Sequence, residues 1–239
     1  MDDGSASVAE QLNVEFFGYL FGLQNLWFTE TLLNTWIIGG AMIAAAVLIR
    51  INMKTWSLVK PTGVQNVVEA IVEMFNSYVK SIMGEKYDYF GNWYFTVFFL
   101  ILFSNLSGLV LLRNPTADIT LTFAFSVTTV FFIHTMGIVK GKGEYFKGFL
   151  APHWSMLPLN LIGEIAPLIS LAMRLFGVMV GGLTLSILIY TVAPWPARLL
   201  FPIAVHGFFD IFAGLLHAFL FLTLSLVFIR NKIPADNNS

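Results

Sequence analysis

The sequence predicts an all-α membrane protein with five transmembrane helices and one amphipathic interfacial helix. Hydrophobic residues make up 57% of the 239 residues and charged residues only 11%, far less charge than a soluble domain of this size carries. Five apolar stretches are each long enough to cross a hydrocarbon core of about 30 Å. The net charge of −1 gives no general attraction to nucleic acid, and a chain without cysteine has no disulfide or thiolate site.

The first half of the chain is expected to cross the membrane twice. Residues 1–30 are acidic and polar, so we expect them to form an N-terminal segment on the outer side. The two spans are expected at Thr31–Ile49 and Trp93–Leu112. In segment 62–80, apolar residues recur at helical spacing, and glutamine and glutamate residues fill the opposite face. This pattern predicts an amphipathic helix that lies on the membrane surface or against partner helices without crossing.

The second half is expected to cross three times. A proline and short polar residues at 114–118 predict a turn, and a span follows at Ile119–Val139. Residues 140–158 are rich in glycine, proline and lysine and are expected to form a loop. Two long segments come last, Leu159–Val192 and Leu199–Ile229. At 1.5 Å per residue each would be about 45–50 Å long, so we expect them to be strongly tilted or curved and to pair as a hairpin.

The positions of lysine and arginine predict the orientation in the membrane. With five crossings, one side of the membrane receives ten of these residues, whereas the other side receives only Arg113 and Arg198. We therefore expect the N-terminus outside and the C-terminus in the cytoplasm. Without an internal repeat or a second domain, residues 1–239 are expected to form a single integral membrane domain that ends in the long hairpin 159–230.

Arg174 lies in the middle of the fourth span. It is the only charged residue between Glu164 and Arg198, so about ten or more residues separate it from the next charge on either side. A guanidinium cannot lose its proton, and at the centre of a membrane helix it costs roughly 2.5–3.5 kcal/mol. Snorkelling to the interface is difficult from this depth. The pattern therefore indicates a charge that is kept for function.

Three titratable residues in the last span follow the spacing i, i+4, i+11. These residues, His206, Asp210 and His217, would share one face of a regular helix. Arg174 and His217 lie roughly 20 Å along their helices from the same side, so they would lie at similar depth. The set predicts a line of ionisable groups that leads from the outer surface toward Arg174. Struts between helices are the alternative for these residues and for His134. His206 and Asp210 supply too few ligands for a metal site, so no metal is expected.

Small residues surround Arg174 on its helix. Ser170 lies one turn before it, and Gly177, Gly181 and Gly182 follow it. Small residues in a membrane helix favour close packing against another helix. The partner is either the hairpin neighbour or another subunit.

Four stretches of the chain resemble, in the same order, the subunit a family of F-type ATP synthases. The resemblance covers nearly the whole chain beyond the N-terminal segment, and the arginine context together with the topology makes it specific. The four stretches are Pro61–Glu73 with its Gln65-Asn66 pair, Asn114–Asp118, Pro158–Ile162 ahead of the Arg174–Gly177 core, and His217–Phe219.

The resemblance implies a proton-translocating stator subunit in the membrane sector of the synthase. In that family an arginine faces a ring of c subunits, each with one membrane carboxylate, and two half-channels reach the ring from opposite sides. The resemblance assigns this role to Arg174 and implies rotor packing at Ser170, Gly177 and Gly181. It implies the c-subunit ring, the b subunits of the peripheral stalk and the whole F1Fo complex as partners in a bacterial plasma membrane. No cofactor and no nucleotide or hydrolytic site are expected in this chain.

The chain departs from the family pattern after the arginine. Many members carry an asparagine directly after the Arg-Leu-Phe-Gly core and an acid or histidine about nine residues past the arginine, where this chain has Val178 and Leu183. We therefore expect Asp210 and His206 to form the outer relay and His217 to be the partner near the arginine. The residues assigned to ion translocation are Arg174, Asp210, His217, His206, Glu164 and Asp118.

Two other functions fit parts of the sequence. In a secondary transporter or channel, Arg174 would bind an anionic substrate, but the chain has no repeat of the kind that transporters often show and only one central cation. An intramembrane hydrolase would need a nucleophile and a base, and Ser170 and Ser186 have no histidine nearby on their helix. The sequence leaves open whether the coupling ion is H⁺ or Na⁺.

Overall fold

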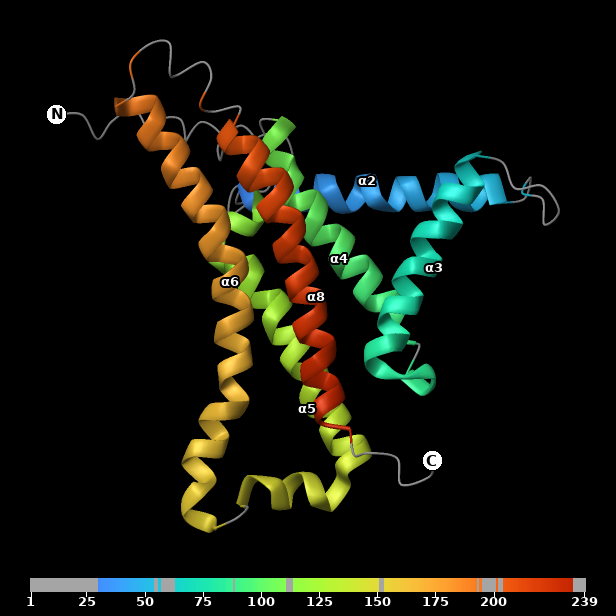
Figure 1. The fold of residues 1–239 in the computed structure, drawn as a ribbon, viewed down its shortest axis with the longest axis vertical. Coiled ribbons are helices and arrows are strands. Elements are labelled where there is room, and N and C mark those ends of the chain that lie inside the picture. The colour runs from blue at the N-terminus through green and yellow to red at the C-terminus, as the bar shows by residue number, and fades with distance from the viewer. Residues whose placement is uncertain are drawn as a thin grey trace, which may run out of the picture.

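The chain folds into a bundle of long helices, shown in Figure 1. Within the described ranges it contains no strand, and five of its helices are long and apolar enough to cross a membrane, so the predicted fold class is confirmed. The predicted N-terminal segment before Glu30 and most of the break around Pro194 lie outside these ranges. The computed structural model describes residues 30–53, 56, 63–87, 89–110, 114–150, 153–192, 194, 201 and 204–233.

Helix α2 (Glu30–Asn52) forms the first predicted span. It lies across the direction of the other helices in Figure 1 and contacts α4 and the η4 turn. Large apolar side chains cover its surface, among them Trp36 at 64% and Ile43 at 68% exposure. A surface of this kind is stable only in an apolar surrounding, because water would not solvate it.

Helix α3 (Gly63–Met83) confirms the predicted amphipathic helix. Its second half packs against α4 and α8, where Phe75 and Val79 are buried. Its first half has no such cover, since Val64 is 72% and Val67 58% exposed. The predicted apolar face is therefore buried in its second half only, and the first half offers an apolar surface to lipid or to a partner.

The second predicted span consists of α4 (Phe90–Leu106) and the short 3-10 helix η3 (Ser107–Val110) that continues it. A further 3-10 turn, η4 (Pro115–Ala117), then begins with the proline of the predicted turn. Proline suits this first position because its missing N–H has no helical partner there. The turn reverses the chain and leads directly into the third span.

Helix α5 (Ile119–Leu150) is longer than predicted, because residues 140–150 of the expected loop 140–158 are helical. The helix kinks at Lys142, whose φ of 43° and ψ of −124° are not helical, and then resumes. Glycines on both sides of Lys142 suggested a loop, but they only provide the freedom that the kink needs. Beyond it, Tyr145 folds back on Gly137, where a Cβ atom would clash with the tyrosine ring.

The last two spans form the predicted hairpin. Helix α6 (Leu157–Val192) runs antiparallel to the last span, Ala204–Asn231, and contacts both parts of it. That last span is not a uniform α-helix. It contains a π-helical segment, η6 (Gly207–Ala213), followed by α8 (Gly214–Asn231).

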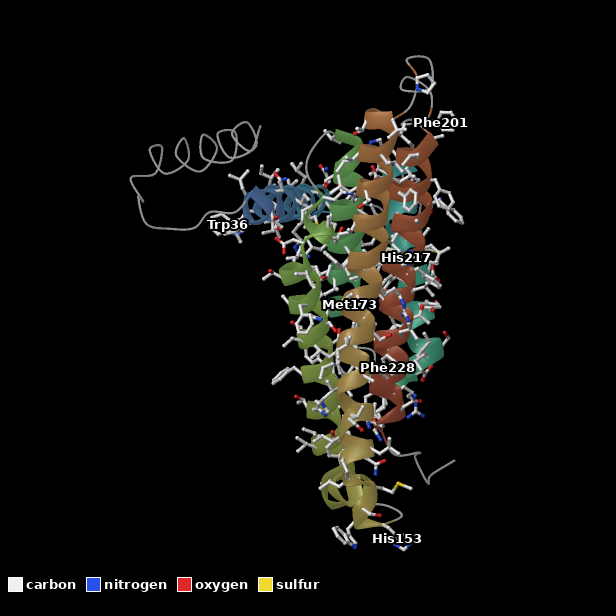
Figure 2. The ribbon with its side chains drawn as sticks, turned by 90° about the vertical axis from the view of Figure 1, so that its left-hand side faces the viewer. Trp36, His153, Met173, Phe201, His217 and Phe228 are labelled. Atoms are coloured by element: carbon white, nitrogen blue, oxygen red, sulfur yellow. The ribbon has the colours of Figure 1, made fainter. Side chains whose placement is uncertain are left out.

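Two clusters of buried apolar side chains hold the bundle together. One joins α3, α4, α5 and α8 near the kinked end of α5, and it includes Tyr94 and Leu226. The other joins α4, α6 and α8 through residues such as Leu171 and Phe221. Phe228, labelled in Figure 2, packs against both clusters. Since lipid is as apolar as these side chains, close packing rather than transfer from water stabilises the contacts in a membrane.

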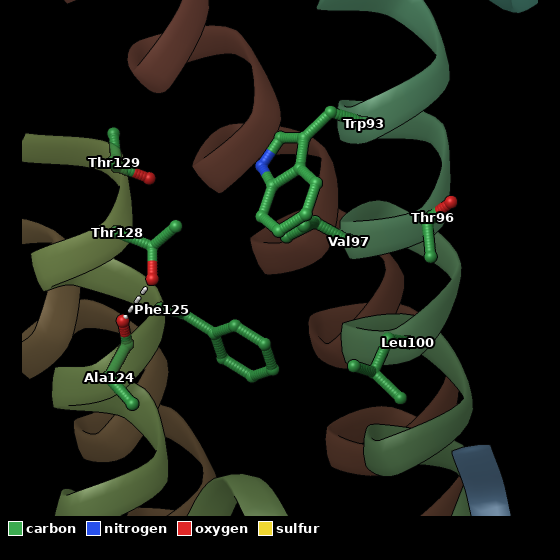
Figure 3. A pocket seen from close by; sticks show the side chains of 8 residues that line it. All are labelled: Trp93, Thr96, Val97, Leu100, Ala124, Phe125, Thr128 and Thr129. Carbon is green, nitrogen blue, oxygen red and sulfur yellow. Dashed lines mark hydrogen bonds between the residues drawn. The ribbon is translucent and has the colours of Figure 1, made fainter. Parts of the chain in front are cut away.

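A groove of about 230 Å³ lies between α4 and α5 on the outer surface of the bundle (Figure 3). Two of its three threonines bond to their own helices: Thr128 Oγ1 donates to the Ala124 carbonyl at 2.9 Å (Figure 3). Thr96 Oγ1 donates to the Asn92 carbonyl at 3.1 Å. The groove therefore presents mainly hydrocarbon at these positions, which suits membrane lipid.

Candidate functional site

Arg174 lies on α6 between two nearly fully buried leucines. Leu171 and Leu175 are each 1% exposed and pack with Ala218 and Phe221 of the opposite helix. Arg174 itself is partly buried, and its Nη1 atom is buried without a hydrogen-bond partner among the described residues. A buried donor without an acceptor is costly, and a guanidinium cannot become neutral. The geometry therefore presents a fixed cation with one buried donor that no described residue satisfies.

The predicted small-residue patch beside Arg174 divides between two surfaces. A Cβ atom at Gly182 would lie 2.9 Å from the Phe209 Cβ atom, so this glycine packs against the hairpin neighbour. At Gly177 and Gly181 a Cβ atom would meet nothing within 4 Å, and both are exposed, as is Ser170. Figure 2 shows Met173, which precedes Arg174, on this helix. The outward-facing small residues leave room for another helix to approach the arginine closely.

Asp210 is the buried carboxylate of the last span and lies in a polar cluster. The Nδ1 atom of His206 lies 2.8 Å from Asp210 Oδ2, as residues at i and i+4 on one helix face can. Asn114 donates its Nδ2 hydrogen to Asp210 Oδ1 at 3.4 Å, and Ser107 Oγ donates to Asn114 Oδ1 at 3.2 Å. A Cβ atom at Gly108 would lie 2.6 Å from Asp210 Oδ2, so only glycine leaves room for the carboxylate there. We call His206, Asp210, Asn114 and Ser107 the Asp210 cluster.

Exposure falls along the Asp210 cluster. The side chain of His206 is 39% exposed, whereas that of Asp210 is 8% exposed. The imidazole can therefore exchange protons with its surroundings and pass them through its hydrogen bond to the buried carboxylate. On the other side, Asn114 Nδ2 lies 3.8 Å from the Met179 sulfur of α6, which brings the cluster to the arginine helix.

The π-helical segment changes the predicted position of His217. In a regular helix, Asp210 and His217 would lie on one face, but η6 inserts an i→i+5 hydrogen bond, from the Gly214 N–H to the Phe209 carbonyl. Asp210 is buried, whereas His217 is only partly buried and donates Nδ1–H to the Ala213 carbonyl at 2.8 Å. The prediction of one continuous line assumed a regular helix, which the segment between these two residues is not, so the step from Asp210 to His217 stays a prediction.

His217 does lie at the level of Arg174. Ala218, the next residue, packs in the same cluster as Leu175, the residue after Arg174. No hydrogen bond joins the two side chains among the described residues, since Arg174 Nη1 has no partner and His217 Nδ1 bonds to its own helix. Because the Ala213 carbonyl can only accept, His217 carries its proton on Nδ1, and Nε2 is the nitrogen that can take up another.

Glu164 and His134 belong to a second cluster, at the kinked end of α5. Glu164 forms an ion pair with Lys232, which follows α8. The Lys232 amine also lies 5.8 Å from the ring centroid of Tyr145, whose hydroxyl is 2.6 Å from His134 Nδ1. Burial, and then the nearby Glu164 carboxylate, raises the pKa of Tyr145 above its ordinary value. In this structure these residues bind α5, α6 and the end of α8 together.

Asp118 caps helix α5. Its Oδ1 atom accepts a hydrogen bond from the Thr120 N–H at 2.8 Å, as an N-terminal capping residue does. Sequence reasoning missed the roles of Asn105, Ser107 and Asn114, which lie close to Asp210 or to the π-helical segment. The signal was present, since Asn105 and Ser107 are polar residues inside the apolar stretch of the second span.

The fold and the site define the class of protein first: a polytopic membrane protein with a fixed cation and titratable side chains inside its spans. In the part of the chain that the structure describes, no three histidine, aspartate or glutamate side chains gather as metal ligands. The family model for the ATP synthase A chain matches residues 32–230. The chain therefore belongs to the family of ATP synthase subunit a, the ion-transporting membrane subunit of the synthase.

Similar proteins cover nearly the whole chain. The ATP synthase subunit a of Limosilactobacillus reuteri is 33% identical over 94% of this chain and 98% of its own length. That of Moorella thermoacetica is 32% identical over 90% of this chain and 95% of its own. The subunit a of Helicobacter hepaticus is 32% identical over 82% of this chain and 88% of its own length.

Proposed function

We propose that this chain is the proton-translocating stator subunit of an Fo sector and couples ion flow to the rotation of a c-subunit ring. The observation that carries the proposal is the buried Nη1 atom of Arg174, which has no acceptor among the described residues and lies beside outward-facing small residues. A carboxylate on a passing rotor helix would supply the acceptor. The b subunits of a peripheral stalk would hold the chain in place, and the first half of α3 offers them an apolar surface.

The chemistry at Arg174 follows from its fixed charge. A positive charge nearby favours the ionised form of a carboxylate and lowers its pKa. A rotor carboxylate that arrives protonated therefore releases its proton when it reaches Arg174. The same charge repels protons, so it prevents a direct leak between the two half-channels. The rotor carboxylate, once past Arg174, takes up a proton from the other half-channel.

The outer half-channel would run through the Asp210 cluster. His206 exchanges protons with water, Asp210 holds the proton inside the bundle, and Asn114 fixes the carboxylate. His217, with Nε2 available, would act as the step nearest Arg174. Asp118, at the start of α5, would belong to the same outer side.

The inner half-channel would start from the other end of the hairpin. Glu164 lies ten residues before Arg174 on α6 and forms an ion pair with Lys232. The excess of lysine and arginine on this side, including Lys232, supports a cytoplasmic C-terminus in a bacterial plasma membrane.

Replacing Arg174 by lysine tests the proposal. Arg174→Lys keeps the charge but loses the planar fork, and a buried lysine can lose its proton. We expect the variant to assemble and to abolish ATP-driven proton pumping in inverted vesicles. Arg230→Lys makes the same chemical change at the end of α8 and is the matched control. Near wild-type pumping by Arg174→Lys would refute the proposal.

Asp210 is tested in the same assay. Asp210→Asn keeps the size of the side chain and its ability to form hydrogen bonds but cannot carry a proton, so ATP synthesis should fall severely while assembly is unchanged. Asp210→Glu should keep part of the activity. Synthesis at the wild-type rate by Asp210→Asn, across the pH range, would place the outer relay elsewhere.

A further inference from the structure

The end of the π-helical segment in the last span is attached at two points to the region around the end of α4, one point within the segment and one directly after it. Within the segment, Asp210 bonds to Asn114. Directly after it, the Gly214 carbonyl accepts a hydrogen bond from Asn105 Nδ2 at 2.9 Å. Both partners come from the region where α4 ends and the chain turns into η4.

Asn105 is placed very tightly. It is fully buried, and its Oδ1 atom accepts a hydrogen bond from Thr116 Oγ1 at 2.6 Å. Thr116 is also fully buried, so both ends of the amide are held without water. Gly214 makes the approach possible, because a Cβ atom there would lie 2.9 Å from the Asn105 Cβ atom.

The hydrogen bond from Asn105 to the Gly214 carbonyl fixes the rotation of the last span about its axis. An i→i+5 bond places one more residue in the turn than an α-helix has, which turns the residues on either side by about 100° relative to each other. With the extra residue, the buried side of the span contains Asp210 and Gly214 and then Ala218. A regular helix that kept Asp210 in place would turn the Gly214 carbonyl away from Asn105 and leave a buried amide without its acceptor.

We propose that Asn105, held by Thr116, is a positioning residue that keeps η6 π-helical and so directs Asp210 toward Asn114. Its role rests on the proposed function of Asp210 as the outer proton relay. The bond from Asn105 stabilises the π-helical register because a regular helix would rotate the Gly214 carbonyl and the Asp210 carboxylate by about 100° relative to each other, so that both could no longer meet Asn105 and Asn114 at once. Asn105 itself carries no proton, so it acts through the position of Asp210.

The direction of the change in a variant also follows from the packing. Downstream of Gly214, the buried side chains of Phe221, Leu226 and Ile229 fix α8 in the bundle. Without the bond from Asn105, the segment before Gly214 is therefore the part that turns. If the segment changed from the π-helical to the α-helical register, Ile211 would take the place of Asp210, because it is one residue closer to Gly214.

Cysteine reactivity measures this register directly, because the chain contains no cysteine of its own. Single cysteines replace Phe209, Asp210 and Ile211 in the full synthase, and each is treated with a small membrane-impermeant thiol reagent. Only a hydrated thiolate reacts, so Cys at 210, beside His206, should react about tenfold faster than Cys at 209 or 211. In the Asn105→Leu background, the fastest position should move from 210 to 211.

Thr116 supplies the matched pair of variants. Thr116→Val removes the hydroxyl donor at nearly constant shape and should move the pattern in the same direction, and it replaces Asn105→Leu if that variant does not assemble. Thr116→Ser keeps the donor and should leave the fastest position at 210. In an otherwise native chain, Asn105→Leu should also lower proton pumping and change its pH profile, whereas Thr116→Ser should not. A fastest position that stays at 210 in Thr116→Val overturns the inference.

The two proposals fail separately. The reactivity pattern needs water beside the half-exposed His206 but no proton transport, so it tests the register even if Asp210 is not the relay. If the pattern moves as expected while Asp210→Asn synthesises ATP normally, the register inference stands and the assignment of the outer relay fails.

Discussion

Two neighbouring glycines in α6 provide a sharp test of the hairpin. A Cβ atom at Gly182 would lie 2.9 Å from both Cβ and Cγ of Phe209, well inside ordinary contact, whereas at Gly181 it would meet nothing within 4 Å. The Phe209 Cβ atom is fixed to its backbone, so the two helices would have to separate. Overpacking of this kind costs typically 1–3 kcal/mol. Both Gly→Ala changes also gain about 0.8–1 kcal/mol of helix propensity.

Comparing Gly182→Ala with Gly181→Ala cancels the propensity gain, because both residues lie inside the same helix. The expected difference in unfolding free energy is therefore the overpacking term alone, about 1–3 kcal/mol, with Gly182→Ala the less stable. Unfolding of the two purified variants in a denaturing detergent titration measures it. Gly181→Ala should be as stable as the wild type or more so, yet pump less, because Gly181 lies on the proposed rotor surface. Equal stability of the two variants would refute the packing of Gly182 against Phe209.

Three further changes test other contacts. Gly108→Ala should displace Asp210, because the new Cβ atom would lie 2.6 Å from its Oδ2 atom, and should reduce proton pumping severalfold while Gly40→Ala, in open space, leaves pumping unchanged. Glu164→Gln should cost about 1–3 kcal/mol by leaving Lys232 without its counter-charge, and the double variant with Lys232→Gln should cost less than the sum of the two single changes. Because the pKa of Tyr145 is raised, its contribution to stability is present below the unfolded value of about 10 and is lost as the pH rises further, so Tyr145→Phe should be less sensitive to alkaline unfolding than the wild type.

The spans were predictable because lipid requires long apolar helices whose backbone groups are all hydrogen-bonded, and such helices leave long apolar stretches in the sequence. The helices begin and end within a few residues of the predictions at α2 and α6. The end of α5 was not predictable in the same way. Glycines beside Lys142 favour a loop locally, but the contacts of Tyr145 with His134 and Lys232 stabilise a second helical stretch.

The candidate site was predictable as residues but not as contacts. The i, i+4 spacing placed His206 beside Asp210 correctly, since it needs only one turn of helix. The longer step to His217 assumed a regular helix, whereas η6 lies on this step, and nothing in the local sequence distinguishes a π-helical from an α-helical turn. Tertiary partners decide it: Asn105 from another helix bonds directly after the segment. Tertiary contacts also decide which α6 residue reaches the Asp210 cluster. This residue is Met179, whereas Leu183, where many family members carry an acid or a histidine, is 47% exposed.

The steep crossing of α2 and α6 in Figure 1 has a simple explanation if both helices span the same bilayer. Helix α6 has 36 residues and is about 54 Å long, so it fits a core of about 30 Å only when tilted by about 56°. Helix α2, with 23 residues and about 35 Å, needs about 30°. Tilts in opposite directions add to nearly a right angle. At this tilt each residue of α6 advances about 0.8 Å across the membrane, so Arg174, seventeen residues after Leu157, lies about 14 Å deep, at the middle of the core.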